Sequence, residues 1–158
     1  MASSMQELIR QVIANFDEQQ TAYRWVLKLA GEQLEMLSND QDRVLFGINE
    51  ILSKRQALMQ EISQMNLTGQ ALQTSICKEL DINEFCLSNL EDKLDRKDFE
   101  DLQQVLTVVG DVLAEISRVD NASHKIMSHS VVGSRGKKIN PDEAALAYKN
   151  ARQNIPEN

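Results

Sequence analysis

The sequence predicts an all-α protein: an elongated antiparallel helical bundle or coiled coil whose flexible C-terminal tail carries a short helix. Three observations predict this fold. Apolar residues recur at every seventh position through residues 9–37, with a second set four residues later. Apolar residues make up 42% of the 158 residues and charged residues 26%, which is typical of a soluble helical domain. Two Pro and six Gly provide too few turns for a sandwich or a barrel.

A long first helix is predicted over residues 5–37, because no Pro interrupts this segment and Ser4 and Glu7 have the spacing of a capping box. At 1.5 Å per residue it would be about 50 Å long. Such a helix cannot bury its apolar stripe against itself, so other helices must cover it. The stripe consists of the heptad positions Ile9, Phe16, Tyr23, Ala30 and Leu37 and the positions Ile13, Leu27 and Leu34 between them, with Gln20 in one slot.

A second helix is predicted from about Gln41 to Met65. It follows a polar break at residues 38–40 and precedes a break at residues 66–69. Arg55 is assigned to its charged outer face. Because a short connection joins two long helices, we expect them to be antiparallel neighbours.

The remainder of the body is predicted as a third segment over residues 70–80, a short helix from about residue 89 and a long helix over residues 99–130. Residues 81–83 interrupt the pattern, and Asp98 is a candidate helix cap. Gly110 is a candidate for close helix approach. The stripe of the last helix becomes polar over residues 120–124, which indicates either fraying or a partner surface. The expected core includes Ile13, Leu27, Leu34, Leu52, Ile62, Leu106 and Leu113.

Two regions follow from this pattern: residues 1–132 form the bundle, and residues 133–158 form a linker and a short amphipathic helix. Asn140 and Pro141 have the chemistry of a helix N-terminus. The helix that follows has about 12 residues and is marginal alone in water. Docking its apolar face, which includes Leu146, in a groove of the body or on a partner helix would stabilise it.

No catalytic, cofactor or metal site is predicted, and we expect the protein not to be an enzyme. His124 and His129 have no further ligand at metal-binding spacing, and Cys77 and Cys86 are expected to be free thiols. Residues 1–132 hold 12 basic and 21 acidic residues, a balance of -9 that argues against nucleic acid. No apolar run reaches the 18 residues of a membrane span, and no signal peptide is visible, so a cytoplasmic location is expected.

The order of the segments resembles the FlgN-type flagellar type III export chaperones and the related FliT-type proteins. The long first helix ends in the break at residues 38–40, and residues 78–90 look like the short third element of the family. A long helix then ends in the Asn-bearing stretch 119–127, and the tail carries Ala147 and Tyr148. The sequence departs from the family at Lys149, since Tyr is frequently followed there by Gly.

This resemblance implies a cytoplasmic chaperone that binds the C-terminal helices of hook–filament junction proteins and delivers them to a component of the export gate. Membrane insertion is not implied, and self-association is left open. The alternative is a generic coiled-coil scaffold or dimerisation protein, which would self-associate through the first stripe. Trp25, beside that stripe, either packs at the bundle edge or contributes to a partner surface. We expect the partner-binding surface to include His124, Ile126, Met127, Val131, Leu146 and Tyr148.

Overall fold

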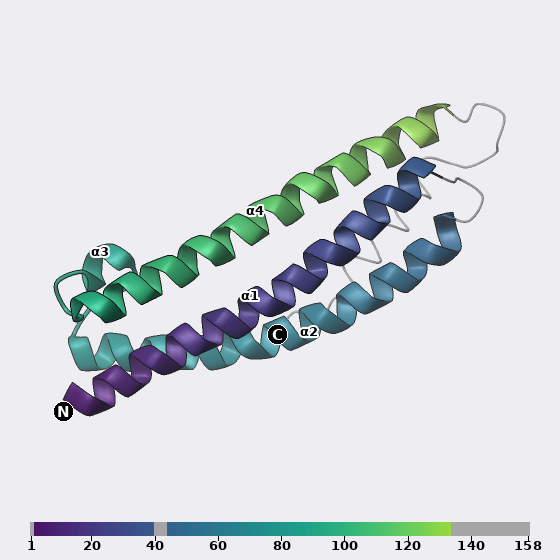
Figure 1. Ribbon diagram of the computed structural model, residues 1–158. Helices are drawn as coiled ribbons and strands as arrows, with labels where there is room; N and C mark the ends of the chain where they lie inside the picture. Colours follow the sequence, from purple (N-terminus) through teal and green to yellow (C-terminus); the bar gives the residue numbers. More distant parts are fainter. Residues whose placement is uncertain (1, 40–43, 134–158) are drawn as a thin grey trace. The chain divides into compact units, whose positions relative to one another are not determined.

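The computed structural model describes residues 2–39 and 44–133, and the predicted linker and tail helix over 134–158 lie outside these residues. The described chain folds into four helices and no strand, which confirms the predicted all-α helical bundle. Figure 1 shows the four helices in chain order, α1 (Ala2–Asn39), α2 (Val44–Leu80), α3 (Leu87–Leu90) and α4 (Arg96–Gly133).

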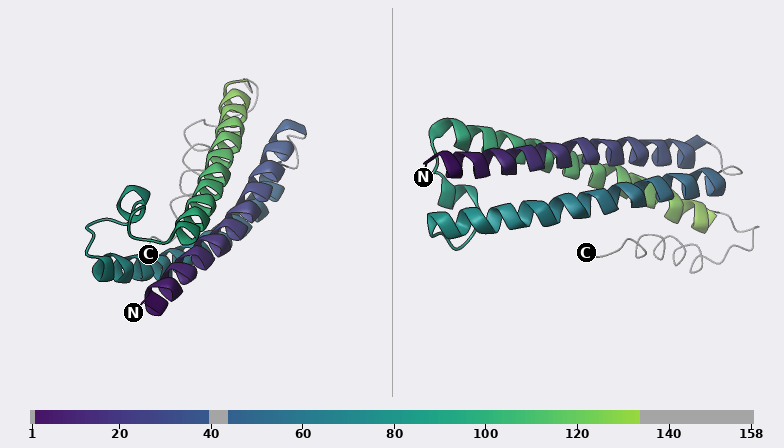
Figure 2. Two further views of the ribbon diagram at one scale, coloured as in Figure 1. Left: turned by 60° about the vertical axis from the view of Figure 1, so that its left-hand side comes forward. Right: turned by 90° about the horizontal axis from the view of Figure 1, so that it is seen from below.

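The chain divides into two compact units, to each of which α1, α2 and α4 contribute one segment. Unit 1 comprises residues 1–23 and 62–113, and the described part of unit 2 comprises residues 24–39, 44–61 and 114–133. Within each unit the α2 segment runs opposite to the segments of α1 and α4 (Figures 1 and 2), as the short connections predict.

Unit 1 holds a cluster of fully apolar side chains. The single turn of α3 supplies Leu90, which is completely buried together with Ile9, Val12, Ile76 and Leu102. Partly buried side chains from both sides of α3, including Phe85 and Leu94, surround this cluster. Burial of this kind stabilises a domain in proportion to the apolar area removed from water, so unit 1 has a conventional hydrophobic core.

The most buried face of α1 coincides only in part with the predicted stripe, of which Ile9 and Ala30 are fully buried as predicted. Ile13, Leu27 and Leu34 are only half-buried, on the flank of this face. Three of the innermost residues are amides, so a search for apolar repeats finds the neighbouring stripe instead. The buried positions of α1 are Ile9, Val12, Asn15, Gln19, Ala22, Val26, Leu29, Ala30 and Gln33. Of the other expected core residues, Ile62 is buried, Leu52 and Leu106 are half-buried, and Leu113 is 39% exposed.

The predicted break at residues 66–69 is absent, because α2 runs continuously to Leu80. Gly69 is buried there, and a Cβ at this position would lie 2.5 Å from Oδ1 of Asn15. Because Gly69 has no side chain, Asn15 fits against α2, and its Nδ2 donates to the carbonyl oxygen of Met65 at 2.9 Å. Gln19 Nε2 in turn donates to Asn15 Oδ1 at 2.7 Å. Gly69 is thus a point of close helix approach, which the sequence pattern presented as a helix end.

The end of α2 confirms the interruption predicted at residues 81–83. Asp81 adopts φ 53°, and the amide of Ile82 donates to the carbonyl of Cys77 at 3.0 Å. The amide of Asp81 also reaches the carbonyl of Lys78 at 3.4 Å, which completes a Schellman motif. The chain therefore leaves α2 at a defined point, and it enters α3 at Leu87, two residues before the predicted start.

Two smaller expectations about α4 were wrong. The cap is Asp95, whose Oδ1 accepts a hydrogen bond from the amide of Asp98 at 2.8 Å, so Asp98 lies inside the first turn. Gly110 is exposed, and a Cβ built on it would meet no atom within 4 Å. Gly110 is consequently not a point of close approach.

The two helical glycines give a matched pair of substitutions. Gly69→Ala should lower the free energy of unfolding by about 1–3 kcal/mol, because the new methyl group displaces Asn15 from its two hydrogen bonds. Gly110→Ala should raise it by about 0.5–1 kcal/mol, since the helix gains propensity without a clash. Urea unfolding followed by circular dichroism measures both, and equal effects of the two variants would contradict the close packing at Gly69.

Candidate functional site

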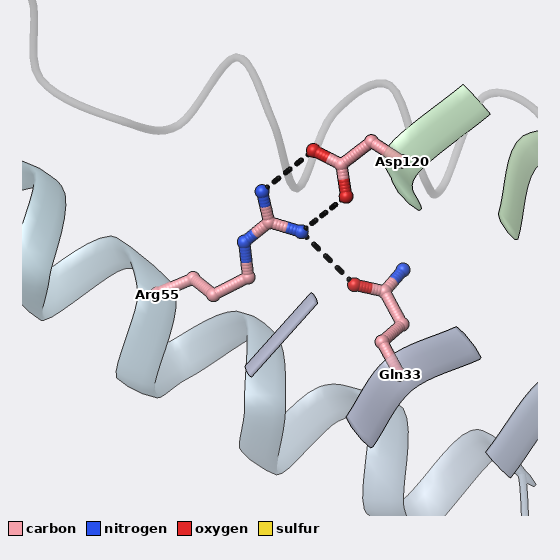
Figure 3. A network of polar contacts seen from close by, with 3 residues as sticks. All are labelled: Gln33, Arg55 and Asp120. Carbon is pink, nitrogen blue, oxygen red and sulfur yellow. Dashed lines mark hydrogen bonds and ion pairs between the residues drawn. The ribbon is translucent and has the colours of Figure 1, made fainter. Parts of the chain in front are cut away.

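One buried polar cluster joins all three helical segments of unit 2 (Figure 3). Arg55 of α2 donates from Nη1 and Nη2 to the two carboxylate oxygens of Asp120 on α4, each at 2.8 Å. Its Nη1 also donates to Oε1 of Gln33 on α1 at 3.1 Å. The side chains of Arg55 and Asp120 are only 17% and 18% exposed, and Gln33 is fully buried. We call Gln33, Arg55 and Asp120 the polar layer.

The helical repeat places Arg55 in the interior. The α2 residues Ile48, Ile62 and Ile76 are buried at fourteen-residue steps, and Arg55 falls halfway between the first two. Its assignment to the outer face was therefore wrong, because the heptad carries the guanidinium to the innermost side. A buried charge needs hydrogen-bond partners of opposite charge. Asp120 forms a bidentate salt bridge with Arg55, which is the strongest arrangement that a carboxylate offers to a guanidinium.

Two buried polar atoms of unit 2 have no hydrogen-bond partner in the part of the chain that the structure describes. They are Nε2 of Gln33 and Oγ of Ser123, and both residues are fully buried. Ser123 follows Asp120 by one turn of α4, so the unpaired hydroxyl belongs to the same region of unit 2. Each unpaired buried polar group lowers the free energy of unfolding by about 1–3 kcal/mol. This region of unit 2 is therefore less stable than a fully paired interior would be.

The residues predicted to bind a partner continue along α4 from this point. His124 is exposed, while Ile126 and Met127 are half-buried. Ile126 and Met127 follow Ser123 by three and four residues, so the three side chains share one face of the helix. The stretch that turns polar in the sequence is helical throughout, since α4 continues to Gly133.

The side chains of three other residues predicted to bind a partner lie outside the described residues. Val131 lies in α4, but its side chain is outside the described residues, as are Leu146 and Tyr148. The sequence prediction marked residues 120–124 as a polar stretch, but it did not foresee that Asp120 pairs with Arg55 or that Ser123 is buried. A usable signal was present, because Arg55 keeps the seven-residue step of Ile48 and Ile62.

Unit 2 also exposes two large apolar side chains on α1. Trp25 is 54% exposed, and Nζ of Lys28 lies 5.0 Å from the centroid of its ring, within the range of a cation–π contact. Met36 is 38% exposed, and its sulfur would lie 2.7 Å from a Cβ built on Gly47 of α2. Trp25 therefore stands at the surface of unit 2 and not in its core.

The reactive groups of unit 1 are in structural positions. Burial, and secondarily the neighbouring Cys86, raise the pKa of the Cys77 thiol, which disfavours the nucleophilic thiolate. Burial, followed by the charge of Asp95, raises the pKa of Asp98 in the first turn of α4. Among the described residues, no group of three or more His, Cys, Asp or Glu side chains is placed to hold a metal ion. Within the same ranges, no helix has the length and apolar character needed to cross a membrane.

Comparison of the chain with protein-family models, with curated proteins and with solved structures gave no match.

The polar layer predicts that two acidic residues on α4 differ sharply in importance. Asp120→Ala should lower the free energy of unfolding by about 2–3 kcal/mol, because it leaves the Arg55 guanidinium in a mostly buried site without its carboxylate. Glu115→Ala is the matched control, since Glu115 pairs with Arg118 on the solvent side of the same helix, and it should leave the melting temperature nearly unchanged.

A second control removes both charges together. The double variant Arg55→Met, Asp120→Leu should recover most of the stability lost in Asp120→Ala, because apolar side chains of similar volume replace a buried ion pair well. Thermal melts of the four proteins measure the series. A double variant less stable than Asp120→Ala would show that the pair contributes more than it loses in desolvation.

Proposed function

We propose that the protein is a cytoplasmic flagellar export chaperone. It binds the amphipathic C-terminal helices of hook–filament junction proteins and delivers them to a component of the type III export gate. The observation that carries this proposal is the end of α4 in unit 2, where half-buried Ile126 and Met127 follow a buried layer whose polar groups are not all paired. The order of helices and breaks along the chain supports the same family.

The partly covered apolar side chains favour a helix as the ligand. An amphipathic helix binds by laying apolar side chains, spaced three and four residues apart, against a complementary surface. Ile126 and Met127 present such a surface on one face of α4, and exposed His124 lies at its edge. A small substrate would instead need a pocket with convergent reactive groups.

The distribution of charge also favours apolar recognition in unit 2. The described segments of unit 2 hold six acidic and six basic residues, whereas unit 1 holds 13 acidic and five basic residues. A neutral surface gives little electrostatic steering, so affinity there must come from apolar contact and from paired polar groups. The acidic balance of unit 1, -8, suits neither nucleic acid nor an anionic membrane.

The alternative of a coiled-coil scaffold has less support. It requires the heptad stripe of α1 to be available for a second chain, but Ile9 and Ala30 of that stripe are fully buried and its other apolar residues are half-buried. A dimer through this face would have to displace the protein's own helices.

Calorimetric titration with a C-terminal helical fragment of a hook–filament junction protein tests the proposal. Met127→Asp should weaken binding at least about tenfold, because a charge would enter the apolar contact. Lys125→Ala, two residues away on the exposed side, should change the affinity less than about twofold. Absence of binding to the unmodified protein would refute the chaperone proposal.

The same titration tests the predicted role of the tail. We expect a chain that ends at Gly133, the last residue of α4, to bind the fragment more weakly than the full chain. Equal affinities would remove residues 134–158 from cargo binding and leave the surface on α4 as the site.

A further inference from the structure

We propose that unit 2 selects cargo helices that carry one side-chain amide, Asn or Gln, within their apolar face. This inference rests on the proposed function, because it names the chemistry that the cargo helix must bring. The receiving groups are Nε2 of Gln33 and Oγ of Ser123, which are buried and without a partner in the described ranges 2–39 and 44–133.

The amide cluster of unit 1 shows what a completed arrangement looks like in this protein. Asn15 and Gln19 occupy the same innermost stripe of α1 as Gln33, and Gln19 precedes Gln33 by two heptads. There, Gln19 donates to Asn15, and Asn15 donates to the carbonyl of Met65. The amide donors of unit 1 are thus used within the chain, whereas the donor of Gln33 remains for another group.

The chemistry of the two unpaired groups favours a neutral primary amide. Oε1 of Gln33 accepts from Arg55, so the Nε2 donor is the polar group of Gln33 that has no partner. The hydroxyl of Ser123 can donate and accept. An incoming amide supplies a carbonyl oxygen for Gln33 and an NH₂ group for Ser123, so a single side chain has the right complement for both.

A charged cargo side chain fits this place poorly. Arg55 and Asp120 neutralise each other through two hydrogen bonds of 2.8 Å. A further carboxylate or ammonium group would lose its hydration without an opposite charge left to compensate it. A fully apolar cargo helix would bring no such loss, but it would leave Gln33 and Ser123 unpaired, and this difference is the basis of selection.

The position of Ser123 connects the selecting groups to the proposed cargo surface. Ser123 lies on the same face of α4 as Ile126 and Met127, within one helical turn. A helix that covers Ile126 and Met127 therefore passes beside Ser123. Because Ser123 and Gln33 are fully buried in the free protein, the segments of unit 2 must separate locally when the amide enters.

The test is calorimetric titration of the junction-protein C-terminal fragment into full-length variants. Gln33→Met and Ser123→Ala should each weaken binding by about five- to tenfold, which is the effect of one lost hydrogen bond in a buried site. Ser123→Ala should not lower the melting temperature, because it removes a hydroxyl that has no partner in the free protein. Weaker binding without weaker folding distinguishes cargo selection from a structural role.

Gln19→Met is the matched control. It removes an amide from the same stripe in unit 1, where the donor is already paired with Asn15, so it should lower stability and leave cargo affinity unchanged. Each Asn or Gln on the apolar face of the fragment is then replaced by Leu. At one position the loss should be non-additive with Gln33→Met, as expected for two groups that contact each other.

The outcomes separate this inference from the proposed function. One outcome is that the fragment binds with the same affinity to Gln33→Met, to Ser123→Ala and to the unmodified protein. That result would refute selection by the polar layer and would leave the proposed chaperone function standing. Additive losses at every amide of the fragment, or tight binding of a fragment with no amide on its apolar face, would also refute the selection. A fragment that does not bind at all refutes the proposed function and this inference together.

Discussion

The Arg55 guanidinium lies where the repeat of α2 calls for an apolar residue, and it is stable there only with its partners. Asp120 supplies two oxygens from α4, and Gln33 supplies a third from α1. These contacts set which residues of the three segments of unit 2 face one another, since a shift of one turn would separate the charges. Fixing register is the best-attested role of polar groups in helical interiors.

The two units consequently differ in how their interiors are built. Unit 1 contains a cluster of completely buried apolar side chains completed by Leu90 of α3, and its amides are paired within the chain. Unit 2 contains a buried ion pair and two polar atoms without a partner in the described residues. Because unpaired buried polar groups lower local stability, we expect unit 2 to open more easily than unit 1. The proposed chaperone function would need a part that stays folded and a part that opens, and we assign these roles to unit 1 and unit 2.

Sequence periodicity was enough to predict the helical class, the antiparallel order and the interruption of the helix at residues 81–83. It failed where side-chain chemistry runs against the usual preference. Asn15, Gln19 and Gln33 made the innermost stripe of α1 appear polar, and Gly69 appeared to be a helix end although it makes room for Asn15. For the site, His124, Ile126 and Met127 were predicted because the stripe of α4 changes near them, and their role in binding stays a prediction. Arg55 and Asp120 were missed because a long-range ion pair depends on how three helices meet, and no local pattern records that.

Hydrogen–deuterium exchange of the full-length protein, with and without the junction-protein C-terminal fragment, tests the central claim most directly. In the free protein, the amides of residues 24–39, 44–61 and 114–133 should exchange faster than those of the α1, α2 and α4 segments in unit 1. Addition of the fragment should slow exchange chiefly in these unit 2 segments, with the strongest protection around residues 120–127 of α4. Protection confined to unit 1, or a unit 2 that exchanges more slowly than unit 1 in the free protein, would contradict the account.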